Sequence, residues 1–322
     1  MVGRVSRRAS SRVVSGLLFG LAAALIGGGW QVATRLSTTT TLPPSELVLL
    51  RYLVPALLLL PITLRRGLWP PTAPRLMLVA MLVGAGLPFG LVAMMGSAWA
   101  PSAHMGVLMA GASPLFAALL AGLLLHERPG RLRAAGLAAM ALGIALLSAS
   151  HWTAGARLDS GEWRGDLLFL LAALLWAGYT LSFRRSGLTP WHAAALVNSG
   201  SALLLLPWLV FLLVRPGPPP LVHAPWADLA SAFVWQGLFA GVLGLWTYSA
   251  AIARIGAGRA AAFGALVPVF SALGGVWLLG EPLGVWQIAA VAATVVGVLL
   301  ASGVFEIWMS RPSSKCQAVE QQ

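Results

Sequence analysis

Apolar segments long enough to cross a lipid bilayer follow one another along almost the whole chain. They lie at residues 13–34, 45–63, 76–98, 104–125, 134–150, 166–183, 192–214, 229–252, 260–279 and 283–304. A helix that crosses the hydrocarbon core needs about 20 mostly apolar residues. Only 9% of the residues are charged, whereas soluble domains carry charge on about 25% of theirs. The sequence therefore predicts an all-α integral membrane protein with ten transmembrane helices.

The basic residues indicate how these helices are oriented. If the N-terminus lies in the cytoplasm, sixteen of the twenty-one arginines and lysines fall in segments that also face the cytoplasm. Basic residues near the span ends favour the cytoplasmic side. The net charge of +12 is thus interpreted as a topology signal, and no nucleic-acid partner is expected. We expect a multi-pass protein of the cytoplasmic membrane, in contact with lipid, with both termini inside.

The two halves of the chain repeat one another. Residues 114–148 and 268–302 align without gaps at an offset of 154, and fourteen of the thirty-five positions are identical. The rarer matches include Pro114 with Pro268 and Glu127 with Glu281. Each half has five predicted spans, an odd number, so the second half is expected to lie upside down relative to the first. Inverted repeats are a common plan of secondary transporters, which bind their solute near the bilayer midplane between the halves.

This repeat divides the chain into parts. We expect a basic cytoplasmic N-terminus at 1–12, a first five-helix repeat at 13–150, an extracytoplasmic linker at 151–165, a second five-helix repeat at 166–304 and a cytoplasmic tail at 305–322. The first apolar run is longer than a typical signal-peptide core, so it is expected to be a retained helix. Glycine-rich faces at 27–29 and 274–275 permit close helix packing and are compatible with a homodimer.

Two similar motifs follow the fourth and ninth predicted helices. Each of these helices contains a proline-aromatic pair and ends in a glutamate, followed by a short polar stretch and a glycine-bearing helix, as in HERPGRLRAAGLAAMALG and GEPLGVWQIAAVAATVVG. These motifs, together with Arg51-Tyr52 in SELVLLRYLVPALLLL, resemble the EamA-type transporters of the drug/metabolite transporter superfamily over residues 13–304. The resemblance implies a ten-helix carrier with two inverted repeats around a central cavity, and often export of amino acids or other metabolites. One departure is that Val197 and Asn198 align with Arg51 and Tyr52, so the seventh helix has no counterpart of Arg51.

Arg51 is the one arginine well inside a predicted span. A charged side chain at the bilayer centre costs about 2.5–3.5 kcal/mol on insertion scales and usually faces a cavity or a partner. One hypothesis is that Arg51 binds an anionic group of the solute. The alternative is structural, with Arg51 paired with Glu46 or with backbone carbonyls, or extended toward the membrane surface.

Aromatic and amide side chains supply further candidates for a solute cavity. An amphipathic solute suits a mostly apolar pocket with a few polar groups. Individually, each candidate also has a structural interpretation, because tryptophan and tyrosine anchor helices at membrane interfaces and buried amides bond neighbouring helices. The interface interpretation is favoured for Trp30, Trp246 and Tyr248, and Trp30 is also kept as a cavity candidate. The remaining candidates for the cavity are Trp30, Trp176, Tyr179, Gln236 and Asn198.

The repeated prolines and glutamates have structural interpretations. Pro114 and Pro268 interrupt the fourth and ninth predicted helices, either as hinges or for packing. Glu127 and Glu281 are expected to cap the helices that follow them, because exposed N–H groups at a helix start attract a carboxylate. His104 lies at a helix start, where we expect a solvated imidazole.

Several function classes lack their signatures. The one lysine lies in the C-terminal tail, so the chain has no phosphate-binding loop of an ATP-driven pump, and no zinc-protease motif or paired aspartates occur. No metal site and no cofactor are expected. No acidic residue lies clearly at mid-span, which favours facilitated or exchange transport over proton antiport. The sequence predicts a secondary transporter of a small solute; the alternatives are an intramembrane enzyme, a channel or a non-transporting scaffold.

Overall fold

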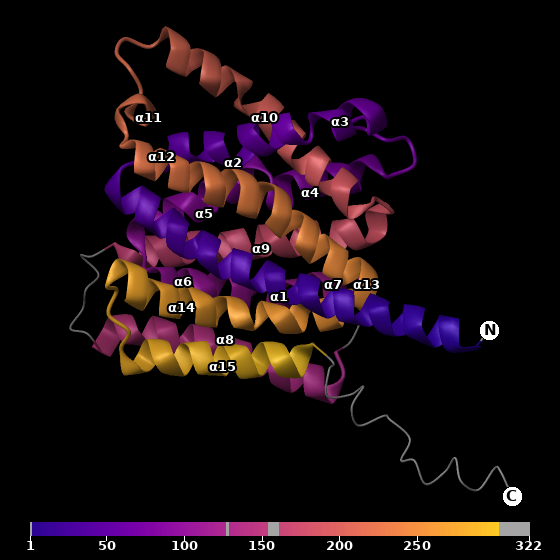
Figure 1. Cartoon of the computed structure of the whole chain (residues 1–322). Helices are drawn as coiled ribbons and strands as arrows, with labels where there is room; N and C mark the ends of the chain where they lie inside the picture. The colour runs from indigo at the N-terminus through magenta and orange to yellow at the C-terminus, as the bar shows by residue number, and fades with distance from the viewer. Residues whose placement is uncertain (1, 127–128, 154–160, 303–322) are drawn as a thin grey trace, which may run out of the picture.

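The computed structural model describes residues 2–126, 129–153 and 161–302, and the regular elements in these ranges are all helices. Their bounds are α1 (Val2–Thr40), α2 (Pro44–Leu58), α3 (Leu60–Arg66), α4 (Arg75–Ala85), α5 (Leu87–Trp99), α6 (Ser102–Met105), the π-helical segment η1 (Gly106–Gly111), α7 (Ser113–Leu125), α8 (Arg131–Thr153), α9 (Glu162–Ser186), α10 (Pro190–Val214), α11 (Pro220–His223), α12 (Trp226–Ala232), the π-helical segment η3 (Phe233–Gly244), α13 (Leu245–Gly264), α14 (Leu266–Leu279) and α15 (Val285–Ala301). Figure 1 shows them as one layered bundle of roughly parallel and antiparallel helices.

Eight helical runs in the described ranges are long and apolar enough to cross a membrane. The bent pair α2–α3 raises this number to nine if it forms one span. The tenth expected segment, 283–304, coincides with α15, an apolar helix of 17 residues. That length falls short of the roughly 20 residues a full crossing needs, so the predicted count of ten is not confirmed by length and composition.

The bend between α2 and α3 has a local cause. The two axes differ by 61° across the break at Leu59, two residues before Pro61. Proline lacks the N–H that would bond the carbonyl four residues earlier, and its ring clashes with that carbonyl. A second break occurs at Gly256, whose φ of 81° is readily adopted by glycine alone. It separates the runs Trp226–Gly256 and Ala262–Leu279.

The exterior of the bundle is apolar. Leu57, Leu64, Leu213 and Trp277 each expose at least 70% of their surface, and many other large apolar side chains point outward as well. Such a surface would not be stable in water, whereas a lipid environment accepts it because helices satisfy their own backbone groups. The chain is therefore a multi-pass membrane protein.

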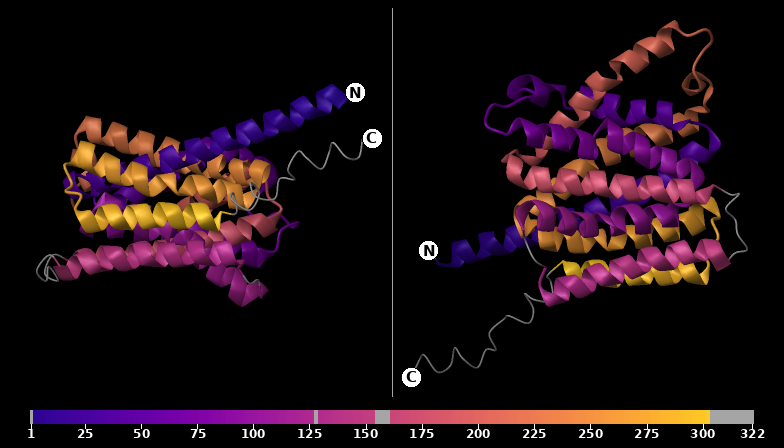
Figure 2. Two further views of the ribbon diagram at one scale, coloured as in Figure 1. Left: turned by 90° about the horizontal axis from the view of Figure 1, so that it is seen from below. Right: turned by 180° about the vertical axis from the view of Figure 1, so that it is seen from behind.

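The equivalent helices α8 and α15 of the two repeats pack closely against each other along one edge of the bundle (Figures 1 and 2). A Cβ placed on Gly136 would lie 2.5 Å from the Ala301 nitrogen, and one on Gly143 would lie 2.9 Å from the Ala290 oxygen. Contacts thus move to lower numbers on α15 as they move to higher numbers on α8, so the two helices run antiparallel. Gly297 contacts Gly136, and Gly143 contacts Ala290. At the offset of 154, Gly297 is the equivalent of Gly143 and Ala290 is the equivalent of Gly136, so the two contacts are related by the repeat.

We expect Gly297→Leu to lower the stability of the protein. A Cβ at this position would lie 2.7 Å from the Gly136 oxygen and 2.7 Å from the Met140 nitrogen, so the two backbones would have to separate. Overpacking of this kind typically costs about 1–3 kcal/mol. Thermal unfolding in detergent measures the effect. Val296→Leu is the matched control, because Val296 is 51% exposed on the same helix; equal melting temperatures for both variants would contradict the packing argument.

The helix α1 packs on α13, α14 and η3 with one side, and side chains such as Leu18 and Leu25 on its other side are exposed. Its N-terminal part projects beyond the other helices in both views of Figure 2. A Cβ on Gly28 would lie 2.4 Å from the Phe270 side chain, and one on Gly274 would lie 2.7 Å from Val32. The glycine-rich faces of the sequence therefore pack on each other's helices within the chain.

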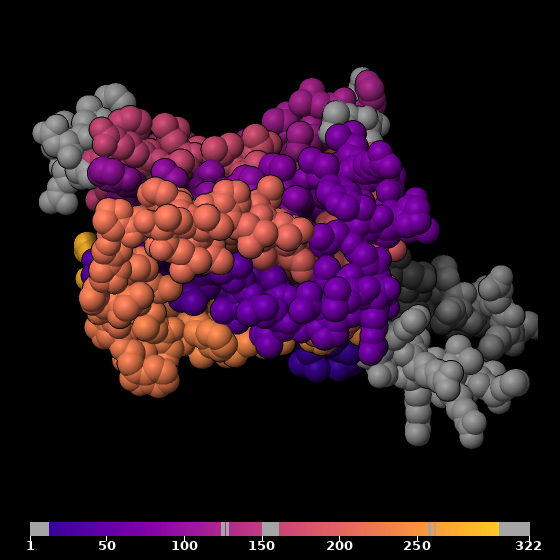
Figure 3. Space-filling view, turned by 90° about the horizontal axis from the view of Figure 1, so that it is seen from above, coloured from indigo at the N-terminus to yellow at the C-terminus, as the bar shows by residue number. Residues whose placement is uncertain are grey.

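A different part of the chain covers the face opposite α8 and α15. There α10 packs on α2, α3 and α4. Seen from this side, Figure 3 shows the orange region of α10 to α12 next to the purple region of α2 to α4. The halves of the chain thus interleave, which places parts of both around the interior.

Candidate functional site

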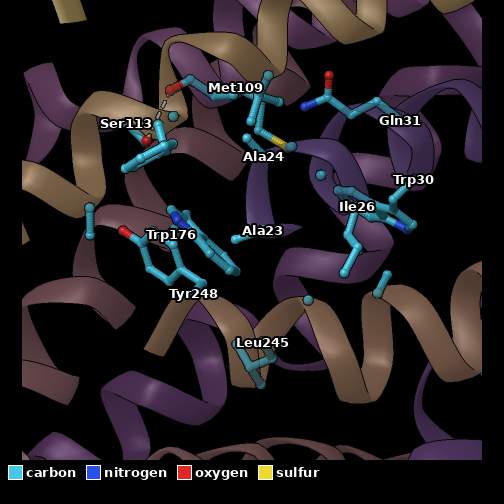
Figure 4. A pocket seen from close by; sticks show the side chains of 18 of the residues that line it. Ala23, Ala24, Ile26, Trp30, Gln31, Met109, Ser113, Trp176, Leu245 and Tyr248 are labelled. Atoms are coloured by element: carbon cyan, nitrogen blue, oxygen red, sulfur yellow. Dashed lines mark hydrogen bonds between the residues drawn. The ribbon is translucent and has the colours of Figure 1, made fainter. Parts of the chain in front are cut away.

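A cavity of about 150 Å³ lies between the two halves of the chain (Figure 4). An engineered apolar cavity of about this volume holds benzene, so the space suits a ring-sized group. Its wall is made mostly of small and apolar side chains from α1, α2, α5, η1, α7, α9, η3, α13 and α14. The lining residues are Gly20, Ala23, Ala24, Ile26, Gly27, Trp30, Gln31, Arg51, Phe89, Met109, Ala110, Ser113, Pro114, Trp176, Ala240, Gly244, Leu245, Tyr248, Ala251, Ala260, Phe263, Gly264 and Val267.

Four aromatic side chains form a continuous part of this wall. The ring centroids of Trp30 and Phe89 are 6.0 Å apart, those of Phe89 and Trp176 are 5.2 Å apart, and those of Trp176 and Tyr248 are 5.4 Å apart. In Figure 4 the rings of Trp176 and Tyr248 lie side by side, with Trp30 on the other side of the cavity. Aromatic pairs at these separations attract each other beyond simple area burial, so the wall is preformed.

The position of Trp30 is set by a chain of hydrogen bonds. Its indole Nε1 donates to Gln236 Oε1 at 2.6 Å, and Gln236 Nε2 donates to Thr34 Oγ1 at 2.9 Å. Gln236 is fully buried and lies outside the lining. Because both of its polar ends are occupied, Gln236 orients the Trp30 ring and offers nothing directly to a solute in this state.

Arg51 contributes a positive charge to the cavity wall. The residue is only 4% exposed, and its Nε and Nη1 atoms have no hydrogen-bond partner among the described residues. The guanidinium carbon lies 5.1 Å from the Tyr52 ring centroid and 5.8 Å from that of Trp30. Glu46, the ion-pair partner considered from the sequence, accepts a bond from the Leu221 backbone N–H at 2.6 Å instead. Within the described part of the chain, Arg51 therefore has aromatic neighbours and no counter-ion.

Besides Gln236, two more of the cavity candidates lie away from the cavity. The Tyr179 hydroxyl lies 3.0 Å from Ser249 Oγ, and its ring is completely buried beside Trp176. Asn198 Nδ2 donates to the Ala194 carbonyl in its own helix and at 2.9 Å to the Gly241 carbonyl in η3. Neither side chain lines the cavity. Of the six proposed cavity residues, the structure brings Trp30, Arg51 and Trp176 together around the open space.

The repeated prolines lie at helix starts that follow a break in the span. Pro114 is the second residue of α7, directly after η1 and Ala112, and lines the cavity. Pro268 is in the first turn of α14, after a break at Ala265. Proline is tolerated in a first helical turn because its missing N–H would have no partner there. π-Helical segments such as η1 often mark functional positions.

Glu281 is the centre of a polar cluster outside the cavity. Its Oε1 pairs with Arg35 Nε at 3.0 Å, and its Oε2 accepts from the Ser102 backbone N–H at 3.0 Å and from Ser102 Oγ at 2.6 Å. The carboxylate thus caps the start of α6, a span of the other repeat, and not α15, the following helix that the sequence suggested. Glu127, expected to act likewise, lies outside the described residues.

His104 corrects another expectation. The residue is 2% exposed, and its Nδ1 lies 2.9 Å from Asp166 Oδ1 at the start of α9. The expected solvated imidazole is therefore a buried one with a carboxylate partner. The sequence could not indicate this, because α6 and α9 belong to different repeats and the two residues are 62 positions apart.

Sequence reasoning missed or misplaced other lining residues. The interface interpretation of Trp30 and Tyr248 is wrong, because both residues line the cavity and Tyr248 lies beside Trp176. Phe89, at the middle of the third predicted span, was not singled out, although its mid-span position was a usable signal. Phe263 follows the break at Gly256 and lies against Gly20. Within the described ranges, no group of three or more His, Cys, Asp or Glu side chains could hold a metal ion.

A duplicated, multi-pass helical protein with a solute-sized cavity between its halves belongs to the class of membrane transporters. The chain matches the EamA-like transporter family over residues 14–149 and 163–303. It belongs to this family, and the predicted resemblance is confirmed. Both repeats are covered by the match, so the two-repeat architecture of the family applies to the whole membrane portion.

One relative also carries the name of a transporter, and one solved structure shares the fold. The chain is 29% identical over 206 residues to the "Uncharacterized transporter YyaM" of Bacillus subtilis (strain 168), which covers 63% of this chain. This chain spans 65% of that relative's length. One crystal structure superposes with a TM-score of 0.61 at 22% identity, covering 93% of this chain and 99% of the other, and therefore shares the fold.

Proposed function

We propose that this EamA-family protein is a secondary transporter that carries a small amphipathic metabolite with an anionic group, such as an amino acid, across the cytoplasmic membrane. The observation that carries the proposal is Arg51, a buried cation without a counter-ion in the wall of an apolar, aromatic cavity. A charge in such a place is costly without a partner. A carboxylate of the solute would supply that partner with charge-assisted hydrogen bonds.

The transport cycle that we propose is alternating access between two inverted five-helix repeats. Antiparallel packing of the equivalent helices α8 and α15 supports a pseudo-twofold axis in the membrane plane. The proposed topology has ten spans, both termini in the cytoplasm, and α15 as the short tenth span. The arginine distribution supports this orientation, and the expected direction of transport is export.

The solute body is proposed to be small and apolar, and a planar ring would fit the wall formed by Trp30, Phe89, Trp176 and Tyr248. Among the described residues, those that line the cavity include no acidic side chain and no histidine. This favours facilitated or exchange transport over proton antiport, and a role in transport rather than catalysis. Efflux from liposomes that stops when the pH gradient is removed would overturn the coupling part of the proposal.

The experiment is an efflux screen with purified protein in liposomes. Anionic, zwitterionic and cationic metabolites of similar size are loaded, and release is compared between the wild type and Arg51→Ala. We expect release of at least one solute that carries a carboxylate, and little release of the same solute by Arg51→Ala. Absence of release for every solute would overturn the transport function. Equal release by both proteins would leave the transporter in place and overturn the anion contact.

A further inference from the structure

The two repeats are joined at one end of the bundle by polar contacts. We call this end, at which α1 finishes, the Arg35 end. Arg35 Nε contacts Glu281 Oε1, and Arg35 Nη1 donates to the Ser97 carbonyl at 2.7 Å. Glu281 also accepts two bonds from Ser102, and Ser271 Oγ donates to the Ser102 carbonyl. Arg35, Ser97 and Ser102 belong to the first repeat, and Ser271 and Glu281 belong to the second. The contacts of Glu281 and Ser271 therefore cross between the halves, whereas the bond from Arg35 to Ser97 lies within the first repeat.

The side chains of this cluster are tightly packed around Gly275. A Cβ added to Gly275 would lie 2.3 Å from Ser102 Oγ and 2.6 Å from Glu281 Oε2. The side chains of Arg35 and Glu281 are 19% and 13% exposed, so the ion pair is largely shielded from solvent. Shielded charge-assisted bonds with several partners are stronger than surface pairs. A second contact joins α6 to the second repeat, between His104 in α6 and Asp166 in α9.

The cavity lies deeper in the bundle than this cluster, farther from the Arg35 end. Its lining residues on α1 run from Gly20 to Gln31, so they stop one turn before Arg35. Met109 lies seven residues from Ser102, about 10 Å along the helix. The Glu281 carboxylate lies beside Gly275, which is eight residues from Val267, about 12 Å along α14. The cavity thus extends away from the Arg35 end, and the polar cluster closes that end.

The span that begins with Ser102 contains residues at which helices commonly bend. α6 is followed by the π-helical segment η1, which contains Gly106 and Gly111, and then by Pro114 at the start of α7. π-Segments and prolines are the usual places where helices bend. The anchored first turn of this span is therefore separated from its cavity-lining part by a stretch with weakened helical bonding.

We propose that Arg35, Glu281 and Ser102 form a latch that keeps the Arg35 end closed while the cavity is open toward the opposite end. Opening of the Arg35 end requires α14 and the residues after it to leave α6, which breaks the Glu281 bonds to Ser102 and Arg35. The latch rests on the proposed alternating access. The latch stabilises the conformation that is closed at the Arg35 end. Its loss therefore raises the population of the conformation that is open at this end.

Cysteine labelling tests the latch without any solute. In a Cys316→Ser background, Met109→Cys places one reporter in the cavity wall, where a smaller side chain adds no crowding. A membrane-impermeant maleimide is applied to either face of oriented vesicles. Val222→Cys identifies the vesicle face that corresponds to the Arg35 end. Val222 is 65% exposed in α11. Its neighbour Leu221 donates a backbone hydrogen bond to Glu46 at the start of α2, so α11 lies at this end.

We expect Met109→Cys to react slowly from the Arg35 face in the otherwise wild-type protein. Glu281→Gln should raise that rate about five- to tenfold, the ratio expected when charge-assisted bonds are lost from one of two states. Gly275→Ala, which displaces Ser102 and keeps every charge, should act in the same direction. Asp228→Asn, which neutralises a partly exposed carboxylate in the first turn of α12 near the same end, is the matched control and should change nothing.

Unchanged labelling from the Arg35 face in both Glu281→Gln and Gly275→Ala would overturn the latch. If Glu281→Gln fails to fold, Arg35→Gln and Gly275→Ala decide the question in the same assay. The outcome is separate from the transport screen. If the wild type releases solute and the latch variants are labelled at an unchanged rate, the latch alone is wrong. If the latch variants are labelled faster and the wild type releases no solute, the proposed function alone is wrong.

Discussion

Arg51→Met is expected to lower the transport of carboxylate-bearing solutes by about 30-fold or more while leaving the folded protein at least as stable. Removing the partner of a buried charged group typically costs about 2–5 kcal/mol in binding, which sets the size of the transport defect. Transport is measured as initial efflux rate per folded protein in liposomes. Stability is measured as the thermal unfolding midpoint in detergent.

The expected sign of the stability change follows from the missing counter-ion. The Arg51 guanidinium is desolvated and has two unbonded nitrogens in the described structure, so the folded state carries its desolvation cost. The contacts with the Trp30 and Tyr52 rings offset part of this cost, by about 0.5–2 kcal/mol each. Methionine fills a similar volume without charge. A structural arginine would show the opposite result, with stability lost on substitution.

Two variants serve as controls for this prediction. Arg75→Met removes an exposed arginine at the start of α4 and should change neither transport nor stability. Arg51→Lys keeps the charge and loses the planar fork, so it should recover part of the transport. The interpretation of Arg51 as a solute contact is wrong if Arg51→Met unfolds several degrees earlier and still transports at the wild-type rate.

Features that depend on local pattern could be predicted from the sequence. Apolar runs and their separation by breakers indicated the spans, and the offset of 154 indicated the repeat. The same reasoning singled out Arg51, Trp30 and Trp176, which the structure places around one cavity. A charge within an apolar run is visible without knowing its neighbours, because the cost of burying it does not depend on which helix is adjacent.

Features that depend on the neighbouring helix could not be predicted. The partner of Trp30 is Gln236, 206 positions away, and the partner of Glu281 is Ser102, 179 positions away. Helical periodicity says which side of a helix is apolar and carries no information about which helix packs there. Glu281 was therefore expected to cap its own following helix, and Tyr248 was placed at the interface although it faces the cavity.

Trp176→Ala is expected to discriminate between solutes according to their apolar part. Trp176 is the central member of the aromatic wall, since its ring contacts those of Phe89, Tyr179 and Tyr248. Its loss should weaken apparent affinity for a ring-bearing solute by about 1–3 kcal/mol, or roughly 5- to 150-fold. An aliphatic solute with the same charged groups makes less contact with the wall and should lose less.

The measurement compares an aromatic and an aliphatic amino acid in the same liposome assay, as concentration dependence of initial efflux. Trp176→Phe should retain most of the selectivity because it keeps a ring at this position. Trp226→Ala controls for general loss of a tryptophan, because Trp226 is 80% exposed at the start of α12. Truncating a large side chain also costs stability, so rates are normalised to folded protein.

The two substitutions separate the two parts of the proposed recognition. Arg51→Met should reduce transport of every carboxylate by a similar factor, because the anionic group is common to all of them. Trp176→Ala should change the ratio between aromatic and aliphatic solutes, because the wall contacts only the apolar part. An equal loss for both solutes in Trp176→Ala would mean that Trp176 supports the fold of the cavity and does not contact the solute.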